Sequence, residues 1–183
     1  MNILGLDIST TTIGVALVNG AGKIILLDYV KPEGIGPLHK AINAGEKLRM
    51  MLHGAQIDVV AIERPAIMFK GGSSGQTVAL LHWFGGAMAV QIWQMFNKSP
   101  IYIAPSTARK VVLGVGRFPK GANTKREVLN GISLLLSKDD WPVGGKGAFI
   151  PECYDMADAA VIALAPVMNL SLIQCVDLSL EGT

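Results

Sequence analysis

The sequence has few residues that could hold a soft metal or form disulfide bonds. Its 183 residues include only two cysteines, Cys153 and Cys175, which form no Cys-x-x-Cys pair. This argues against a disulfide framework and against a zinc site, and favours the reduced cysteines of a cytosolic protein. Charge is also sparse: 16% of the residues are charged and 50% are hydrophobic. This composition excludes a disordered tail and a charge-rich fibre and predicts one domain, 1–183, with a single core.

One long stretch, between Lys70 and Lys98, has no acidic or basic residue. Its apolar part, 78–96, is long enough to span a bilayer. However, it contains a histidine, two glutamines and a Gly-Gly pair, which are unfavourable in hydrocarbon. A helix that is apolar nearly all round is typical of a core or a subunit interface, so we expect no membrane span. The first residues also lack the basic region and cleavage site of a signal peptide.

The charges are distributed unevenly along the chain. Between Lys98 and Lys146 there are nine Lys or Arg residues against three Asp or Glu, whereas the remainder has seven against eleven. This pattern suits a protein that binds a polyanion with one surface and cations with another, although ordinary solvated charge would explain it equally well.

The order of the predicted elements indicates an α/β fold. Three strands follow one another too closely for crossover helices and predict an antiparallel meander. Later strands alternate with helices and predict parallel pairing, which gives a five-stranded mixed sheet with helices on both faces. The expected strands are 2–8, 11–20, 23–30, 57–63 and 100–104; the expected helices are 36–52, 76–96, 105–114, 123–137 and one that contains Asp155 and Asp158. The segment 170–180 could be a further strand.

Local patterns add detail to this prediction. In the first helix the expected inward positions are Leu38, Ile42, Leu48 and Leu52. Side-chain caps are expected from Ser106 or Thr107 for the helix over 105–114, and from Asn123 or Thr124 for the next helix.

Four carboxylates stand at positions that the predicted topology brings together. Asp7 and Glu63 end two strands that would be parallel neighbours, and open α/β sheets place their sites at such strand ends. Asp155 and Asp158 are three residues apart and therefore share one helix face. Four ionised carboxylates repel one another, and a pair of hard cations, Mg²⁺ or Mn²⁺ rather than zinc, would compensate them. Two such ions about 4 Å apart are suited to phosphodiester hydrolysis.

Each acid alone also has a structural explanation. An Asp at a strand end often forms a turn, and Asp155 would stabilise the positive end of its helix dipole. Glu63 is harder to explain in this way, because glutamate has a weak preference for strands. The four together favour a functional site.

Three segments resemble the acidic motifs of a known nuclease family. These are "ILGLDISTTTIGVALV", "VVAIERP" and "YDMADAAVIALA", and they look like the motifs of RuvC-type Holliday junction resolvases in the RNase H-like superfamily. The resemblance runs from Asn2 to about Ala165. It implies an RNase H-like fold and a dimeric endonuclease that nicks four-way DNA junctions in pairs with Mg²⁺ or Mn²⁺, and it matches the four acids to the catalytic tetrad.

The resemblance also implies roles for other residues. Phe69 would stack on a base near the junction centre with Lys70 beside it, Lys125 would act near the scissile phosphate, and the 76–96 helix would form a homodimer interface. Candidate contacts to the DNA backbone are Arg109, Lys110, Arg117, Lys120 and Arg126. Ordinary packing would also explain Phe69, and ordinary surface charge would explain each basic residue.

The sequence departs from the family at two places. Its first motif reads Asp-Ile-Ser-Thr where many relatives have Asp-Pro-Gly-Ser, and the loop over 141–152 is longer than in compact bacterial members. A phage or mobile-element version is therefore an alternative to a cellular enzyme.

Three other functions stay open. They are another RNase H-like nuclease acting on hybrid or branched nucleic acid, a junction-binding protein that does not cleave, and a fragment of an actin-like ATPase or sugar kinase. The last has a similar first loop, but 183 residues are too few for its two domains.

Overall fold

A five-stranded mixed sheet forms the centre of the computed structural model, which describes residues 1–65, 75–136 and 141–174. The strand order is β3-β2-β1-β4-β5. The first three strands pair antiparallel, and β4 pairs parallel with both β1 and β5. The prediction of three antiparallel and then two parallel strands is confirmed. The strands are β1 (Asn2–Ile8), β2 (Ile13–Asn19), β3 (Ile24–Val30), β4 (Val59–Glu63) and β5 (Ile101–Ile103).

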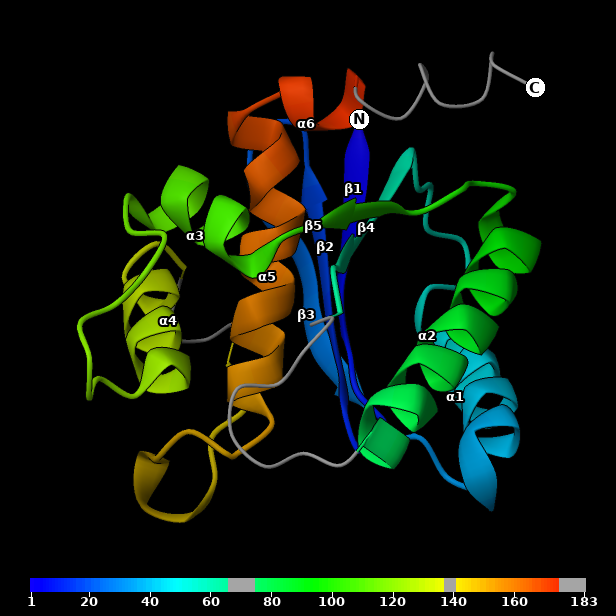
Figure 1. The fold of residues 1–183 in the computed structure, drawn as a ribbon. Helices are drawn as coiled ribbons and strands as arrows, with labels where there is room; N and C mark the ends of the chain where they lie inside the picture. The colour runs from blue at the N-terminus through cyan, green and yellow to red at the C-terminus, as the bar shows by residue number, and fades with distance from the viewer. Residues whose placement is uncertain (66–74, 137–140, 175–183) are drawn as a thin grey trace.

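Helices cover both faces of this sheet (Figure 1). One face carries α1 (Gly36–Met51) and α2 (Gly75–Phe96), and the other carries α3 (Pro105–Leu113), α4 (Thr124–Ser133) and α5 (Cys153–Met168). Two short helical segments complete the described chain: η2 (Gly145–Gly147) and α6 (Ser171–Gln174). None of the described helices is both long enough and apolar enough to cross a membrane.

The alternation of side chains along the strands divides the interior into two cores. In β1, Ile3 packs in the core beneath α5, whereas Leu4 and Leu6 pack in the core beneath α1 and α2. Because successive residues of a strand point to opposite faces, Asp7 lies on the same face as Ile3, toward α5. The same period in β4 puts Ala61 and Glu63 on the α5 face.

The helix α5 lies unusually close to the sheet. A Cβ atom on Gly14 would be 2.0 Å from the Asp155 carbonyl oxygen, and one on Gly5 would be 2.4 Å from that of Ala159. The inner side of α5 is rich in buried alanines, so no large side chain separates its backbone from β1 and β2. Glycine is needed at both strand positions because any side chain there would push the helix away.

The inward face of α1 differs from the prediction. Leu48 and Leu52 are buried as expected, but Leu38 and Ile42 are 63% and 40% exposed. The buried stripe instead contains the small residues Ala41, Ala44 and Gly45. Small residues let α1 approach α2 closely, to the point that a Cβ on Gly45 would lie 2.6 Å from Gln91 Oε1. The size of the contact residues therefore outweighs their hydrophobicity on this face.

The predicted caps have mixed outcomes. Asn123 caps α4 by accepting a hydrogen bond from the Arg126 backbone N–H at 3.2 Å. The cap of α3 is not Ser106 or Thr107, because the helix already begins at Pro105 and no side chain caps it. Proline suits the first helical position, since its missing N–H would have no partner there.

Two further expectations concern the carboxyl-terminal part. Ser171–Gln174 is helical, which contradicts a strand over 170–180 in that part; 175–183 lie outside the described residues. Cys153 is buried and free, while Cys175 is among the residues that the structure does not describe.

We predict that Gly14→Ala destabilises the protein by about 3 kcal/mol, because the added methyl group overlaps backbone atoms that cannot move independently. Gly86→Ala is the matched control: nothing lies within 4 Å of a Cβ there, and alanine raises helix stability by up to about 1 kcal/mol. Urea unfolding curves measure both. Equal stability of Gly14→Ala and the native protein would contradict the close approach of α5.

Candidate active site

The four acids line one cavity of about 440 Å³ at the carboxyl ends of β1 and β4. Asp7 comes from β1, Glu63 from β4, and Asp155 and Asp158 from the first turns of α5. Segments from both ends of the chain thus meet at one place. The cavity also contains Arg109, Lys125, Arg64, Pro65, Leu81, Ile8, Ser9 and Thr11.

The register of the strands explains this convergence. Leu6 of β1 pairs with Ile62 of β4, so Asp7 and Glu63 follow this pair as the next residue of each strand. Asp7 is also the register partner of Gly14 in β2, and Gly14 is the residue on which the Asp155 backbone rests. The close contact at Gly14 therefore brings the first turn of α5 over Asp7.

Two cationic side chains pair with the acids of α5. Lys125 Nζ of α4 lies 2.7 Å from Asp155 Oδ1, and Arg109 Nη2 of α3 lies 3.3 Å from Asp158 Oδ1. The Arg109 side chain is 17% exposed, and that of Lys125 is 56% exposed. Arg109 is thus a mostly buried part of the acid cluster, while Lys125 reaches the acids from the solvent side.

Burial and mutual repulsion raise the pKa values of three of the acids. Burial is the largest cause for Asp7, and the charges of Glu63 and Asp158 add to it, so its pKa is well above the usual range. The pKa of Glu63 rises to about 7, chiefly through burial and then through the charge of Asp158. Burial also raises the pKa of Asp158, although Arg109 opposes this effect. The site therefore holds more negative charge than its surroundings stabilise.

Lys125 responds to the same field in the opposite sense. Partial burial lowers its pKa, but the hydrogen bond to Asp155 and the nearby acidic charges outweigh that effect, so the net pKa is raised. Lys125 is accordingly protonated at neutral pH and carries a positive charge at the rim of the cavity.

The donor set of this cavity fits hard divalent cations. It provides carboxylate oxygens, which Mg²⁺ and Mn²⁺ prefer, and its four acids outnumber the two cations that pair with them. Within the described part of the chain, no three acid, histidine or cysteine side chains stand grouped around a single point as metal ligands. In this arrangement Asp155 is paired with Lys125 and Asp158 with Arg109.

The other candidate residues are placed differently. Lys110 and Arg117 line a separate open cavity of about 670 Å³ along α3, and Lys120 and Arg126 are exposed. Phe69 and Lys70 lie outside the described residues.

Arg109 was expected from the sequence to contact the DNA backbone, and the sequence did not indicate its ion pair with Asp158. Its spacing from Asp158 carries no local signal, because the two side chains belong to different helices. Ser9 and Thr11 were also missed as lining residues of the cavity, although both belong to the segment that contains Asp7. The Ser9 hydroxyl donates to the Thr12 carbonyl oxygen at 2.7 Å and shapes the turn beside the cavity.

The comparisons with known proteins find similarity in structure only. No family model matches the sequence, and neither does any curated protein. The Thermus thermophilus RuvC structure matches with a TM-score of 0.65 at 21% identity, over 94% of this chain and 96% of that one. RuvC of T. thermophilus in complex with a Holliday junction substrate has a TM-score of 0.67 at 16% identity, with the same coverage.

A viral protein gives a weaker match. The complex of Fowlpox virus resolvase with Holliday junction DNA has a TM-score of 0.51 at 15% identity, over 93% of this chain and 99% of that one. At identities this low, the structural matches show a shared fold and nothing more. They confirm the α/β, RNase H-like architecture expected from the sequence.

We predict that the stability of the EDTA-treated protein falls between pH 5 and pH 8 through Glu63. In the folded state the pKa of Glu63 is about 7, whereas its ordinary value is 4.5. The folded state therefore binds more protons than the unfolded chain between these two values. The contribution of Glu63 to stability is fully present below pH 4.5 and is lost as the pH rises toward 7. Asp7 acts in the same direction.

Glu63→Gln isolates this contribution, because it removes the titrating group and keeps the shape. Compared with the native protein, the variant should gain up to about 3 kcal/mol in stability on going from pH 5 to pH 8. Urea unfolding at several pH values in EDTA is the measurement. Parallel curves for the two proteins would show that Glu63 is not held in the protonated state.

Proposed function

We propose that this chain is a divalent-metal-dependent endonuclease that resolves four-way DNA junctions by paired nicks. The observation that carries the proposal is the convergence of Asp7, Glu63, Asp155 and Asp158 on one cavity, in a chain whose fold matches RuvC over nearly its full length. The four acids and Lys125 are the proposed catalytic residues, and the whole chain, 1–183, would act as one nuclease domain.

The choice of DNA architecture has separate support. Two of the similar structures are complexes with a Holliday junction. A fold fixes the position of a site more firmly than its substrate, so junction selectivity is the part of the proposal that depends most on experiment.

The proposed cofactor is Mg²⁺ or Mn²⁺, with two ions held by the four acids. When bound, such ions activate water and stabilise the charge that develops on the scissile phosphate. The excess of carboxylates over cationic partners and the raised pKa of Glu63, about 7, support this assignment. Both indicate that the positive charge on the side chains around the four acids does not balance their negative charge.

The chain's own side chains have distinct tasks in this mechanism. Arg109 is mostly buried and orients Asp158 through its ion pair. Lys125 is more than half exposed, so its ammonium group is free to turn from Asp155 to the phosphate and to stabilise negative charge there. Asp7 and Glu63 are partly buried, and this partial desolvation strengthens the charge interactions in the cavity.

Contacts with the DNA backbone are proposed for the exposed basic residues of the α3–α4 region: Lys110, Arg117, Lys120 and Arg126. The excess of positive charge between Lys98 and Lys146 supports this role. Stacking of Phe69 on a junction base, with Lys70 beside it, also remains part of the proposal.

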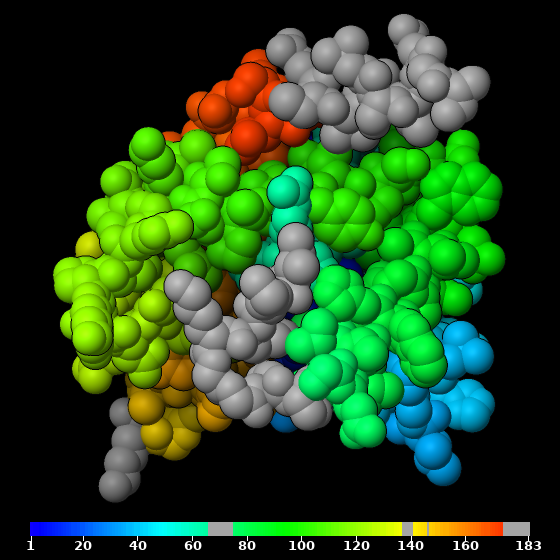
Figure 2. Space-filling view, in the orientation of Figure 1, coloured from blue at the N-terminus to red at the C-terminus, as the bar shows by residue number. Residues whose placement is uncertain are grey.

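We also propose a homodimer formed through α2. Four large apolar side chains of this helix are at the surface: Leu80, Trp83, Val90 and Trp93 are 44%, 69%, 54% and 53% exposed. The side chains of α2 form part of the outer surface on the right of Figure 2. A face with two exposed tryptophans is typical of an interface, and paired nicks require two active sites.

A DNA substrate would place the enzyme in the cytoplasm of a bacterium or of a phage-infected cell. The Asp-Ile-Ser-Thr motif after Leu6, in place of the family's Asp-Pro-Gly-Ser, favours a phage or mobile-element version.

For the dimer, we expect Trp83→Glu to raise the dissociation constant by roughly 30-fold or more, because a central Trp anchor contributes about 2 kcal/mol or more. Sedimentation equilibrium measures the effect. Leu134→Glu is the matched control, since Leu134 is 86% exposed and follows α4 rather than α2. A native protein that is monomeric throughout, or a dimer that tolerates Trp83→Glu, would rule out this interface.

The function is tested with a synthetic four-way junction, a linear duplex and an RNA–DNA hybrid, each with Mg²⁺, Mn²⁺ or EDTA. We expect paired nicks in the junction only, and none in EDTA. Cutting of the hybrid alone would keep the metal site and assign a different nuclease activity. Binding of the junction without cutting would indicate a junction-binding protein, and a lack of both would call for an ATP hydrolysis assay.

Asp7→Asn provides the residue-level test. It should reduce nicking by more than about 100-fold, since loss of even an indirect metal contact costs 10- to 100-fold. Junction binding should persist, because the backbone contacts are unchanged. Glu46→Gln, an exposed acid on α1, is the control. Normal nicking by Asp7→Asn would refute the metal assignment.

A further inference from the structure

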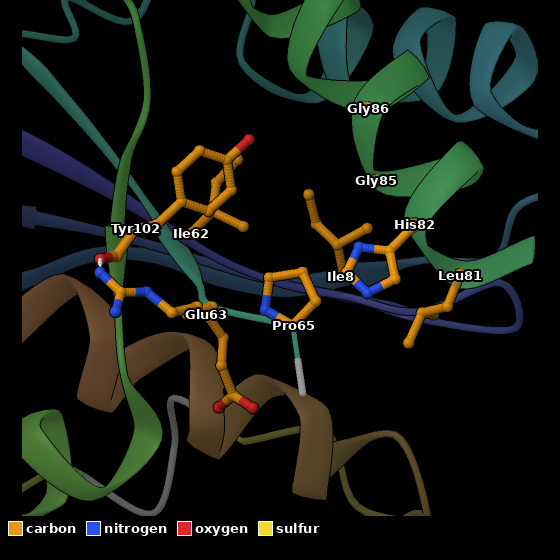
Figure 3. A pocket seen from close by; sticks show the side chains of 10 residues that line it. Ile8, Ile62, Glu63, Pro65, Leu81, His82, Gly85, Gly86 and Tyr102 are labelled. Atoms are coloured by element: carbon orange, nitrogen blue, oxygen red, sulfur yellow. Dashed lines mark hydrogen bonds between the residues drawn. The ribbon is translucent and has the colours of Figure 1, made fainter. Parts of the chain in front are cut away.

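A second cavity, of about 480 Å³, opens beside the acid cavity. It lies at the same edge of the sheet but on the face covered by α2. Its walls come from the end of β4, from β5 and from α2, and Figure 3 shows them from close by. The lining residues are Ile8, Ile62, Glu63, Arg64, Pro65, Leu81, His82, Gly85, Gly86 and Tyr102.

The two cavities adjoin each other at the end of β4. They share five lining residues: Ile8, Glu63, Arg64, Pro65 and Leu81. In Figure 3 the Glu63 carboxylate points toward α5, away from Tyr102 and His82. A polynucleotide with one phosphate at the acids would therefore have its neighbouring nucleotide at the mouth of the second cavity.

The walls of the second cavity suit a flat, partly polar ring. Ile62, Pro65 and Ile8 provide an apolar lining, and Figure 3 shows the Tyr102 ring on one side and the His82 imidazole on the other. Tyr102 is 41% exposed, so a large part of its ring is free to stack. Bases stack on aromatic side chains with little regard to sequence, and the volume lies within the usual range for small-ligand sites.

A cation is held at the rim of this cavity. Arg64, which lines this cavity, donates from Nη2 to the Tyr102 backbone carbonyl oxygen at 3.2 Å. Such a group can donate to the edge of a base or to a flanking phosphate. The cavity thus combines stacking, apolar contact and a hydrogen-bond donor.

Two adjacent glycines keep the cavity open. Gly85 and Gly86 lie in the middle of α2, where glycine stabilises a helix less than alanine does. A Cβ on either residue would have nothing within 4 Å, so no packing of α2 requires glycine at these positions. The open space in front of Gly85 is the feature that a bound ring would use.

We propose that this second cavity, the base cavity, binds one unpaired nucleobase of the cleaved strand, adjacent to the scissile phosphate. The proposal rests on the proposed nuclease function and extends it, because a bound base would select the nucleotide beside which the enzyme nicks. Extrusion of that base costs least near a junction centre, where the continuous stacking of base pairs is interrupted.

The test combines one variant with one change in the DNA. Gly85→Leu fills the base cavity, while Gly85→Ala, the matched control, gives the same gain in helix preference and leaves most of the space. Junctions carry a single abasic position on either side of the nick. Nicking rates are measured with Mg²⁺, and affinities for the junctions and for short single strands are measured in EDTA by fluorescence anisotropy.

With the native protein and Gly85→Ala, we expect an abasic site on one flank to lower the rate and the affinity by roughly tenfold. Gly85→Leu should show that same loss with intact DNA and no further loss with the abasic site. Equal abasic effects in the native protein and Gly85→Leu, or no abasic effect on either flank, would overturn the proposal.

The two proposals fail in different ways. If no junction is nicked with Mg²⁺ or Mn²⁺, the nuclease function fails, and the affinities in EDTA still decide whether the base cavity exists. If junctions are nicked but Gly85→Leu behaves like Gly85→Ala in every assay, the base cavity fails and the nuclease function stands.

Discussion

The close approach of α5 to the sheet is the constraint on which the acid cavity depends. Without side chains at Gly5 and Gly14, the backbone of α5 rests directly on β1 and β2. Gly14 is also the register partner of Asp7. The contact that sets the height of the helix therefore also sets the distance between the acids of α5 and those of the strand ends. A substitution at Gly14 would therefore change the geometry of the cavity even though all four acids are retained.

Bringing several carboxylates together in a partly buried cavity is electrostatically unfavourable, and the packing of the rest of the protein compensates for this. Burial raises the pKa of Asp7, Glu63 and Asp158, and the two ion pairs offset part of the repulsion. The two cations differ in exposure: the Arg109 side chain is largely enclosed, whereas more than half of the Lys125 side chain is open to solvent. An enclosed cation suits a fixed support for a carboxylate, and an open one suits contact with an arriving phosphate.

Much of this structure follows from sequence pattern, and the exceptions share a physical cause. Alternation and turn residues predict β1 to β3, and strand ends bearing Asp7 and Glu63 predict where the acids meet, because these are local patterns combined with one topological rule. The inward face of α1, the pairing of Arg109 with Asp158 and the base cavity were not predictable in this way. Each depends on how closely two segments that are distant in sequence approach one another. At α1 that distance is set by small residues such as Gly45, which has no side chain to separate the helices.

The helix α2 shows how one segment can serve several environments. Phe84, Met88 and Ile92 recur every four residues and are fully buried against the sheet side. Gly85 borders the base cavity, and Trp93 is exposed on the remaining surface. The core face, the cavity face and the exposed face of α2 each carry apolar residues. Its sequence is therefore apolar all round for three separate reasons, which explains why it resembles a membrane span in composition while its glycines and polar residues fit a globular fold.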